Sequence, residues 1–429
     1  MISLMPLSFK PSDNISFYIF ISAMFCTLFG MLLWLWDLNT IRLGLIVIGL
    51  FLYLLAGLLA IFFEKKLKYI SFLGKAAVFF YFFFYFYCII VNQFSNGFHS
   101  AYIPNFFWDS GFFFIGIGCL SFIRISKKNL KHMIGFYLVF FLIDIIFTAK
   151  YLNPFVAFHA VDRRDSFRLI SEGLGHAHKA YHLHTILSAL ALVFFAITLE
   201  YIKEKKWIFL SLLGVIAMLF FGLFYQKRNI FLEIGLFFIF FVLLPSFKIT
   251  RTGRNLKIFG LITFFGLLGL YFTSELFNSG VNLVLNRFSE GYHKTGANER
   301  FEETYFFFRQ YDLIYYFFGR GLTSFVPGTE GGNNLHMGMG NFILKGGYFM
   351  LSYLTVLLLL NLLYSIRLFF LRGVKILLWI QVFCIFSIYT YLSFWGWFPD
   401  IMTLPLSLLI FDINKTFKTD ETVSIDKVH

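Results

Sequence analysis

Apolar stretches long enough to form membrane helices recur along nearly the whole chain, and this feature limits the possible fold more than any other. A helix needs about 20 mainly apolar residues to cross the hydrocarbon core of a bilayer, and it satisfies its own backbone hydrogen bonds there. The stretches are continuous rather than alternating, which argues against a membrane β-barrel. We therefore predict an all-α polytopic membrane protein, folded as a single integral membrane domain over residues 1–429.

The composition supports this prediction. Hydrophobic residues make up 59% of the chain and charged residues 14%, against roughly 45–50% and 25% in soluble domains. Such a chain cannot assemble a water-facing surface, which excludes an ordinary soluble enzyme and a disordered chain. The four cysteines lie inside apolar stretches without C-x-x-C spacing, so we expect neither disulfides nor a thiolate metal site.

About twelve membrane helices are expected, and the last of them is weak because it is short and contains Pro399, Asp400 and Pro405. Eleven spans therefore remain an alternative. The expected spans are Ile15 to Trp36, Ile41 to Phe63, Tyr69 to Val91, Phe106 to Ile123, Met133 to Leu152, His182 to Ile202, Trp207 to Tyr225, Asn229 to Pro245, Ile258 to Phe277, Asn341 to Ile366, Lys375 to Phe394 and Phe398 to Ile413.

The net charge is +13, and the way the basic residues are distributed among the loops indicates how the chain is oriented in the membrane. The loops after even-numbered spans hold 17 Lys or Arg, whereas the short loops on the other side hold three. Because Lys and Arg concentrate on the cytoplasmic side, both termini are predicted to be cytoplasmic, including a tail over residues 414–429. No nucleic-acid-binding motif is found, so the charge does not indicate a nucleic-acid partner.

Two long connections then face outward, over residues 153–181 and 278–340. Loops of that length without a fold of their own are often functional. Within the larger loop, residues 298–318 have aromatic residues at helical spacing, with Asn298 as a plausible cap and Gly319 as the stop. We expect an amphipathic helix there that lies in the outer membrane–water interface.

A basic pair, Lys227-Arg228, occupies a short turn on the expected outer face, where positive charge is unusual. One interpretation is that both side chains reach outer-leaflet headgroups. The other is anion capture, because Arg228 precedes a helix whose N-terminus favours a phosphate group. Glu233, about one turn further on, is a candidate intramembrane partner of Arg228.

The large outer loop carries two further candidates. Arg300, in the first turn of the expected interfacial helix, is either a solvated charge or a second cation. His336 lies in a glycine-rich stretch just before the tenth span, where no core explains a histidine. As a base it would accept a proton near neutral pH and could activate a sugar hydroxyl, although a surface role without chemistry is the alternative.

The segment Phe318-Gly319-Arg320-Gly321, followed by Asn334-Leu335-His336 and Lys345-Gly346-Gly347, resembles the closing signature of the O-antigen polymerase and O-antigen ligase family. That signature has an arginine-bearing helix, a G-x-G, a variable stretch, a histidine and a later glycine pair. The many spans, the large late outer loop and an arginine at a central outer turn fit as well. The family often has Asn directly after the histidine, where this chain has Met337.

The resemblance implies glycosyl transfer at the outer face of the bacterial inner (plasma) membrane, from a polyprenyl-diphosphate-linked glycan to a lipid-linked repeat unit. Arg228, Arg300 and Lys227 would bind the diphosphate, and His336 would be the catalytic base, with Glu299 as second choice. No metal or other cofactor is expected, and a chain-length regulator is a possible partner. Two alternatives stay open: a ligase that transfers the glycan to a lipid core, and a glycan or lipid flippase.

The smaller outer loop is also basic. Arg163, Arg164 and Arg168 are expected to contact the acceptor or the growing glycan, and an Arg/Asp surface network is the alternative. Four histidines follow within residues 176–184. His178 and His182 would share one helical face, but no carboxylate or cysteine completes a zinc site nearby, so polar residues at a helix mouth are the preferred interpretation.

Overall fold

The computed structural model describes residues 15–33, 38–62, 72–96, 127–151, 191–224, 228–243, 309, 312–321 and 338–389, with scattered positions between 258 and 285. Every secondary-structure element among these residues is helical. The elements are α1 (Ile15–Leu33), α2 (Asn39–Phe62), α3 (Phe72–Asn96), α6 (Lys127–Tyr151), the π-helix η4 (Thr198–Ile202), α10 (Lys205–Phe224), α11 (Arg228–Phe238), the π-helix η5 (Ile239–Leu243), α15 (Leu313–Phe318), α16 (Gly338–Arg372) and α17 (Ile376–Tyr389).

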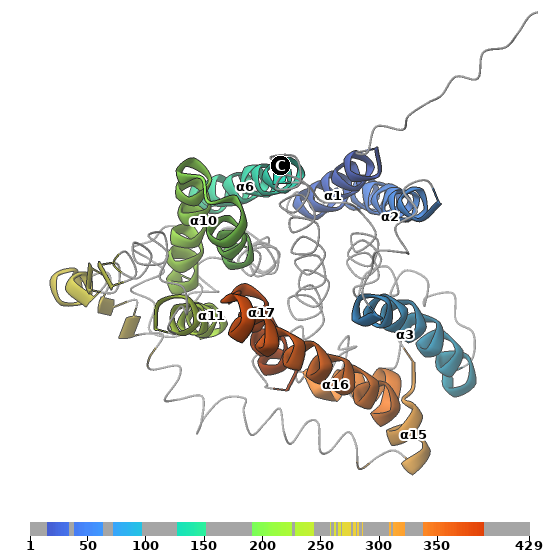
Figure 1. The fold of residues 1–429 in the computed structure, drawn as a ribbon. Coiled ribbons are helices and arrows are strands. Elements are labelled where there is room, and N and C mark those ends of the chain that lie inside the picture. The colour runs from blue at the N-terminus through green and yellow to red at the C-terminus, as the bar shows by residue number, and fades with distance from the viewer. Residues whose placement is uncertain are drawn as a thin grey trace, which may run out of the picture.

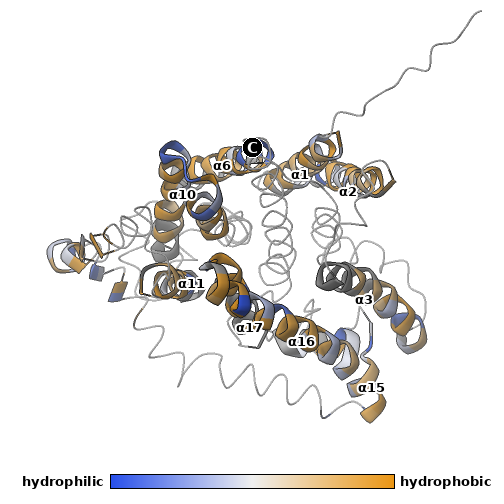
Figure 2. Cartoon of the chain, in the orientation of Figure 1, coloured by the Kyte–Doolittle hydropathy of each residue, from blue (hydrophilic) through white to orange (hydrophobic). Residues whose placement is uncertain are grey.

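Two of these helices are long and apolar enough to cross a membrane, over Thr40–Ala60 and Ile343–Leu371. Shorter apolar helices cover Ile15–Gly30, Phe86–Ser95 and Ala191–Ile202. Large apolar side chains point outward from several helices, among them Phe51 and Phe94, which are 65% and 87% exposed. Figure 2 shows that most of the coloured helical ribbon is apolar, with hydrophilic residues at some helix ends. Such surfaces are stable against lipid and costly against water, which supports membrane association.

Most described helices begin and end near the expected spans, but three extend further. α3 ends at Asn96, α6 begins at Lys127, and α16 runs from Gly338 to Arg372. The basic residues Lys127 and Lys128, expected in a loop, therefore lie in the first turn of α6. Lysine is a good helix former and its long side chain reaches water from a helix end. The expected spans Phe106 to Ile123 and Phe398 to Ile413 lie outside the described residues.

α1 and α2 form a close helical pair. At Gly49, an added Cβ would lie 2.6 Å from the Thr27 methyl group, so this glycine lets the two backbones approach. Thr27 Oγ1 donates to its own helix, to the Ala23 carbonyl at 3.1 Å, and also lies 3.3 Å from the Tyr53 hydroxyl of α2. A small residue and a hydroxyl contact thus help to join the two helices.

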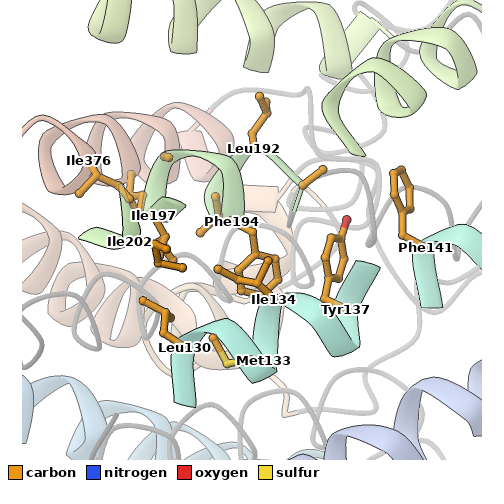
Figure 3. Close-up of a cluster of buried hydrophobic side chains, with 14 of the residues drawn as sticks. Leu130, Met133, Ile134, Tyr137, Phe141, Leu192, Phe194, Ile197, Ile202 and Ile376 are labelled. Atoms are coloured by element: carbon orange, nitrogen blue, oxygen red, sulfur yellow. The ribbon is translucent and has the colours of Figure 1, made fainter. Parts of the chain in front are cut away.

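The buried apolar core of the described residues is formed mainly by α1, α2, α6, the helix ending in η4, and α17. Figure 3 shows its central side chains, with Tyr137 and Phe194 facing one another; their ring centroids are 4.8 Å apart. The hydroxyls of Thr198 and Ser211 lie 2.7 Å apart, so this polar contact is satisfied within the core. The core closes on Trp379 of α17, whose ring packs edge-on against Phe237 at 5.5 Å.

Glu200 connects this core to the start of α17. Its carboxylate accepts from the backbone N–H of Lys375 at 3.0 Å and of Ile376 at 3.3 Å, two of the donors that a helix N-terminus leaves without intrahelical partners. η4 carries Glu200 and is followed by Lys203, which has a left-handed φ of 59°. The carboxylate also complements the positive end of the helix dipole.

The helices are arranged so that α11, α17 and α16 follow one another along one side of the bundle (Figure 1). α3 and α15 both pack against α16, at the end of this row that is away from α11. This order brings segments that are distant in sequence to one place: α3 from the first quarter of the chain, and α15 and α16 from the last third. The candidate site is built at that place.

Candidate functional site

α16 is interrupted at Gly347, whose φ of 67° and ψ of −178° are not helical. Residues 338–346 form a short helix before the break, and residues 348–372 form a long one after it. From Tyr348 to Leu371 the long part has 24 residues, or about 36 Å. This exceeds the hydrocarbon thickness of roughly 30 Å, so the part after the break is by itself long enough to span a bilayer.

The extended segment Gly319–Gly321 pairs with the backbone at this break. The N–H of Arg320 donates to the Leu344 carbonyl at 2.7 Å, and the N–H of Gly321 donates to the Lys345 carbonyl at 3.0 Å. A helix that ends leaves its last carbonyls without intrahelical donors, and here the neighbouring segment supplies the donors. We call Phe318–Gly321 together with Leu344–Gly347 the junction.

The glycines of the junction are required by its geometry. Gly319, Gly321 and Gly347 have φ values of 75°, 91° and 67°, in the left-handed region that favours glycine. A Cβ on Gly347 would lie closer than 3.0 Å to the Phe317 carbonyl oxygen, and one on Gly319 would lie 2.5 Å from the Lys345 carbonyl oxygen. A Cβ on Gly321 would collide with Asn92. The G-x-G and the later glycine therefore belong to one packing arrangement.

α3 holds the junction through side chains spaced along one face. The hydroxyl of Tyr87 donates to the Phe318 carbonyl at 2.8 Å, and the hydroxyl of Ser95 donates to the Arg320 carbonyl at 2.8 Å. The thiol of Cys88 lies 3.5 Å from the Lys345 carbonyl oxygen as a weak donor. Positions 87 and 95 are eight residues apart and so lie on the same face of α3. The helix thus fixes both arms of the junction.

Two basic residues lie at the junction. Lys345 is fully buried, whereas Arg320 is partly exposed and its guanidinium lies 5.1 Å from the centre of the Tyr315 ring. This distance is that of a cation–π contact, which orients the guanidinium. Since the Arg320 backbone is bonded on both sides and its side chain rests on Tyr315, the cation is held in a defined position.

α15 differs in part from the interfacial helix expected over residues 298–318. Arg309 is helical, but Asp312 is extended, with φ of −67° and ψ of 154°, and α15 begins after it as a separate helix. Asp312 is the N-cap residue of α15: its backbone is extended, as is usual at a helix start, and its carbonyl accepts from the Tyr315 N–H at 2.9 Å. Gly319 ends α15 as expected, with its N–H donating to the Tyr315 carbonyl at 2.8 Å. Leu313 and Ile314 are 76% and 60% exposed, as an interfacial helix requires.

Most of the candidate residues from the sequence lie outside the described residues. Arg228 is the first residue of α11, and its backbone is placed while its side chain lies outside the described part. Glu233, its expected partner, is buried in the same helix. The candidates beyond the described ranges are Lys227, Glu299, Arg300, His336, Arg163, Arg164 and Arg168.

The sequence alone predicts no role for four side chains that lie at or contact the junction, those of Tyr87, Ser95, Arg320 and Lys345. Tyr87 and Ser95 are hydroxyl residues eight apart in an apolar helix, and Lys345 is a cation inside an expected span. Polar groups at such positions need partners, which is the signal that could have identified them. Arg320 was noted only as the middle residue of the G-x-G. What the structure adds is that all four meet at one break in α16.

Comparison of the chain with known proteins finds no matching family, no matching curated protein and no matching solved structure.

Proposed function

We propose that the chain is a membrane glycosyltransferase of the polysaccharide polymerase type. It would join lipid-linked repeat units at the outer face of a bacterial inner membrane, as a multi-pass protein of eleven or twelve spans with both termini in the cytoplasm. The observation that carries the proposal is the junction: the G-x-G and the Lys345-Gly346-Gly347 segment, which are two parts of the signature behind the family resemblance, are bonded to each other at a helix break. Glycine is required in both segments for the same reason, because a Cβ on Gly319 or on Gly347 would collide with the backbone of the other segment or of α15.

The location of the break supports an enzyme that acts at the membrane surface. The long part of α16 is by itself long enough to span the bilayer, which supports a junction at the end of the proposed span, next to the exposed apolar side chains of α15. The orientation predicted from Lys and Arg makes this the outer face. His336 lies two residues before α16 begins, so the proposed base belongs to the same end of this helix.

The proposed reaction is a metal-independent glycosyl transfer. A hydroxyl of the acceptor sugar attacks the anomeric carbon of the donor glycan, and a new glycosidic C–O bond forms. The bond between that carbon and the diphosphate oxygen breaks, and the lipid diphosphate leaves with its charge stabilised by Arg228, Arg300 and Lys227. His336 takes the hydroxyl proton, with Glu299 as second choice. Arg163, Arg164 and Arg168 would contact the acceptor glycan.

The ligase alternative uses the same donor and the same chemistry, with a lipid core as acceptor. The transporter alternative gains support from the interrupted helix, because transporters often have broken helices. Those breaks lie near the middle of the bilayer, however, and the break in α16 lies 24 residues from the far end of its apolar stretch at Leu371. This position favours the enzyme.

The test is a glycan profile by gel of cells in which the gene is deleted and then complemented with the wild type or with Arg228→Ala. A deletion that leaves a core bearing one repeat unit, with no ladder restored by Arg228→Ala, supports the polymerase. A core without any repeat unit, with accumulated lipid-linked polymer, would establish the ligase instead. An unchanged profile would contradict both and favour transport.

A further inference from the structure

The helices α6 and α10 lie side by side and run in the same direction (Figure 1). Near their starts, the Lys131 ammonium of α6 lies 2.5 Å from the carboxylate of Glu204, the residue before α10. Further along, a Cβ added at Gly214 of α10 would lie 3.4 Å from the Leu138 side chain of α6. Because the contacts advance along both helices together, the helices are parallel. Two segments that are distant in sequence therefore begin at one end of the bundle.

This end of the bundle carries an excess of exposed positive charge. We define the basic patch by its exposed lysines, which are Lys128 in the first turn of α6 and Lys203, Lys205 and Lys206 around the start of α10. The glutamates of the same segment are engaged elsewhere, since Glu200 accepts from the start of α17 and Glu204 pairs with Lys131. The first turns of α6 and α10 hold no acidic residue. Lysine there is the opposite of the charge that a helix N-terminus favours, so an external anion would be stabilised at the patch.

Each of the two helices continues from the basic patch with an exposed apolar face. The side chains of these faces are Phe209, Leu213 and Ile216 on α10 and Val139, Leu142 and Ile146 on α6. The residues on α10 follow Lys205 at intervals of four, four and three, and those on α6 follow Lys128 after about three, four and five turns. A lysine and a row of exposed apolar side chains thus share one face of each helix.

Trp207 marks the level at which the lysines give way to apolar side chains. It lies in the first turn of α10, is partly exposed, and its ring would lie 3.3 Å from a Cβ added at Gly135 of α6. Tryptophan is enriched at the membrane–water interface, where its ring lies at the depth of the lipid headgroups. The basic patch therefore belongs at the depth where a phospholipid carries its phosphate.

We infer that the basic patch binds the phosphate of an anionic phospholipid, whose acyl chains lie along the exposed apolar face of α10. A phospholipid has an anion joined to apolar chains in the same order as the lysines and the apolar face, and basic sites between membrane helices bind such headgroups. A free phosphate would leave the apolar side chains uncovered, and a lipid without net charge would leave the lysine charge in excess. The bound lipid stabilises the two adjacent helix starts, where lysines repel one another. This binding is separate from the proposed glycosyl transfer.

The test is a lipid titration of the purified full-length protein in neutral detergent, followed by native mass spectrometry. The probes are dioleoyl phosphatidylglycerol, which is anionic, and dioleoyl phosphatidylcholine, which has the same chains and no net charge. The wild type should bind the anionic lipid roughly tenfold more tightly. Changing Lys205→Gln and Lys206→Gln together should remove this preference, whereas Lys205→Arg with Lys206→Arg should retain it. Glutamine and lysine have similar helix propensity and both lysines are exposed, so the fold should persist.

The matched control changes Arg309→Gln and Arg367→Gln together, which removes two exposed cations that lie outside α6 and α10. It should keep the wild-type preference for the anionic lipid. Equal affinity of the wild type for the two lipids would overturn the inference, as would equal losses in the two double glutamine variants. Inorganic phosphate is the last probe and should not displace the lipid at equal concentration. Displacement at that concentration would identify a site for free phosphate and overturn the lipid site.

Discussion

The backbone N–H of Arg320 donates to the Leu344 carbonyl at 2.7 Å across 24 positions of sequence. This bond joins the end of α15 to the interrupted start of α16, and it sits at a place where a helix leaves a carbonyl without its own donor. It therefore holds the segment that follows α15 against the first part of α16. The proposed function depends on this connection.

Gly347→Ala should destabilise the junction strongly. The new Cβ would collide with the Phe317 carbonyl oxygen, and the left-handed φ of 67° adds strain of roughly 1–2 kcal/mol for a residue with a side chain. Gly373→Ala is the matched control, because Gly373 has a φ of 71° but no atom within 4 Å of the added Cβ. Thermal unfolding in detergent should therefore show a larger loss for Gly347→Ala. Equal losses would mean that strain alone, and not the close contact, explains the glycine.

Tyr87→Phe and Ser95→Ala should each weaken the attachment of the junction to α3. Each removes one donor to a backbone carbonyl, with an expected loss of about 1 kcal/mol in the free energy of unfolding. Ser22→Ala is the control, since the Ser22 hydroxyl only bonds back to Tyr18 of its own helix. Stability curves in denaturant provide the measurement. A Ser95 variant as stable as the Ser22 variant would show that the α3 contact contributes nothing.

Glu200→Gln should lower stability by about 1–2 kcal/mol, because the neutral amide accepts more weakly from the N-terminus of α17 and loses the dipole interaction. Glu204→Gln is the comparison. Its carboxylate pairs with Lys131 at 2.5 Å, but with its side chain 44% exposed it should contribute roughly 0–1 kcal/mol. Thermal unfolding at low and high salt distinguishes them, since only the exposed pair should be strongly screened. A larger loss in Glu204→Gln would reverse this ranking.

His336→Ala and Arg228→Ala should each abolish glycan extension while the protein still inserts into the membrane, because one removes the proposed base and the other a cation for the leaving diphosphate. His132→Ala provides the control, as His132 is an exposed histidine of α6. Gels of the extended glycan, with immunoblots of the membrane fraction, give the measurement. Normal chain length in His336→Ala would remove that residue from the mechanism and leave Glu299 as the candidate base.

The sequence determined that the described chain is helical, because unbroken apolar stretches without period-two alternation form helices that satisfy their own backbone. It also located several helix ends: α1 begins at the predicted Ile15, and Gly319 ends α15 as its position in the pattern predicted. Local chemistry decides these features, since hydropathy and glycine act on neighbouring residues. The number of spans, the orientation and the catalytic roles remain predictions.

Only the tertiary structure decided that α16 breaks at Gly347 and that Gly319–Gly321 pairs with the break. A glycine pair in an apolar stretch is compatible with an unbroken helix. Here the helix breaks, and another segment supplies the backbone N–H groups for the carbonyls that the break leaves without donors. The same holds for Tyr87 and Ser95, whose acceptors lie more than 220 positions away. Partners that far apart carry no local signal, so the site had to be read from the packing of α3, α15 and α16.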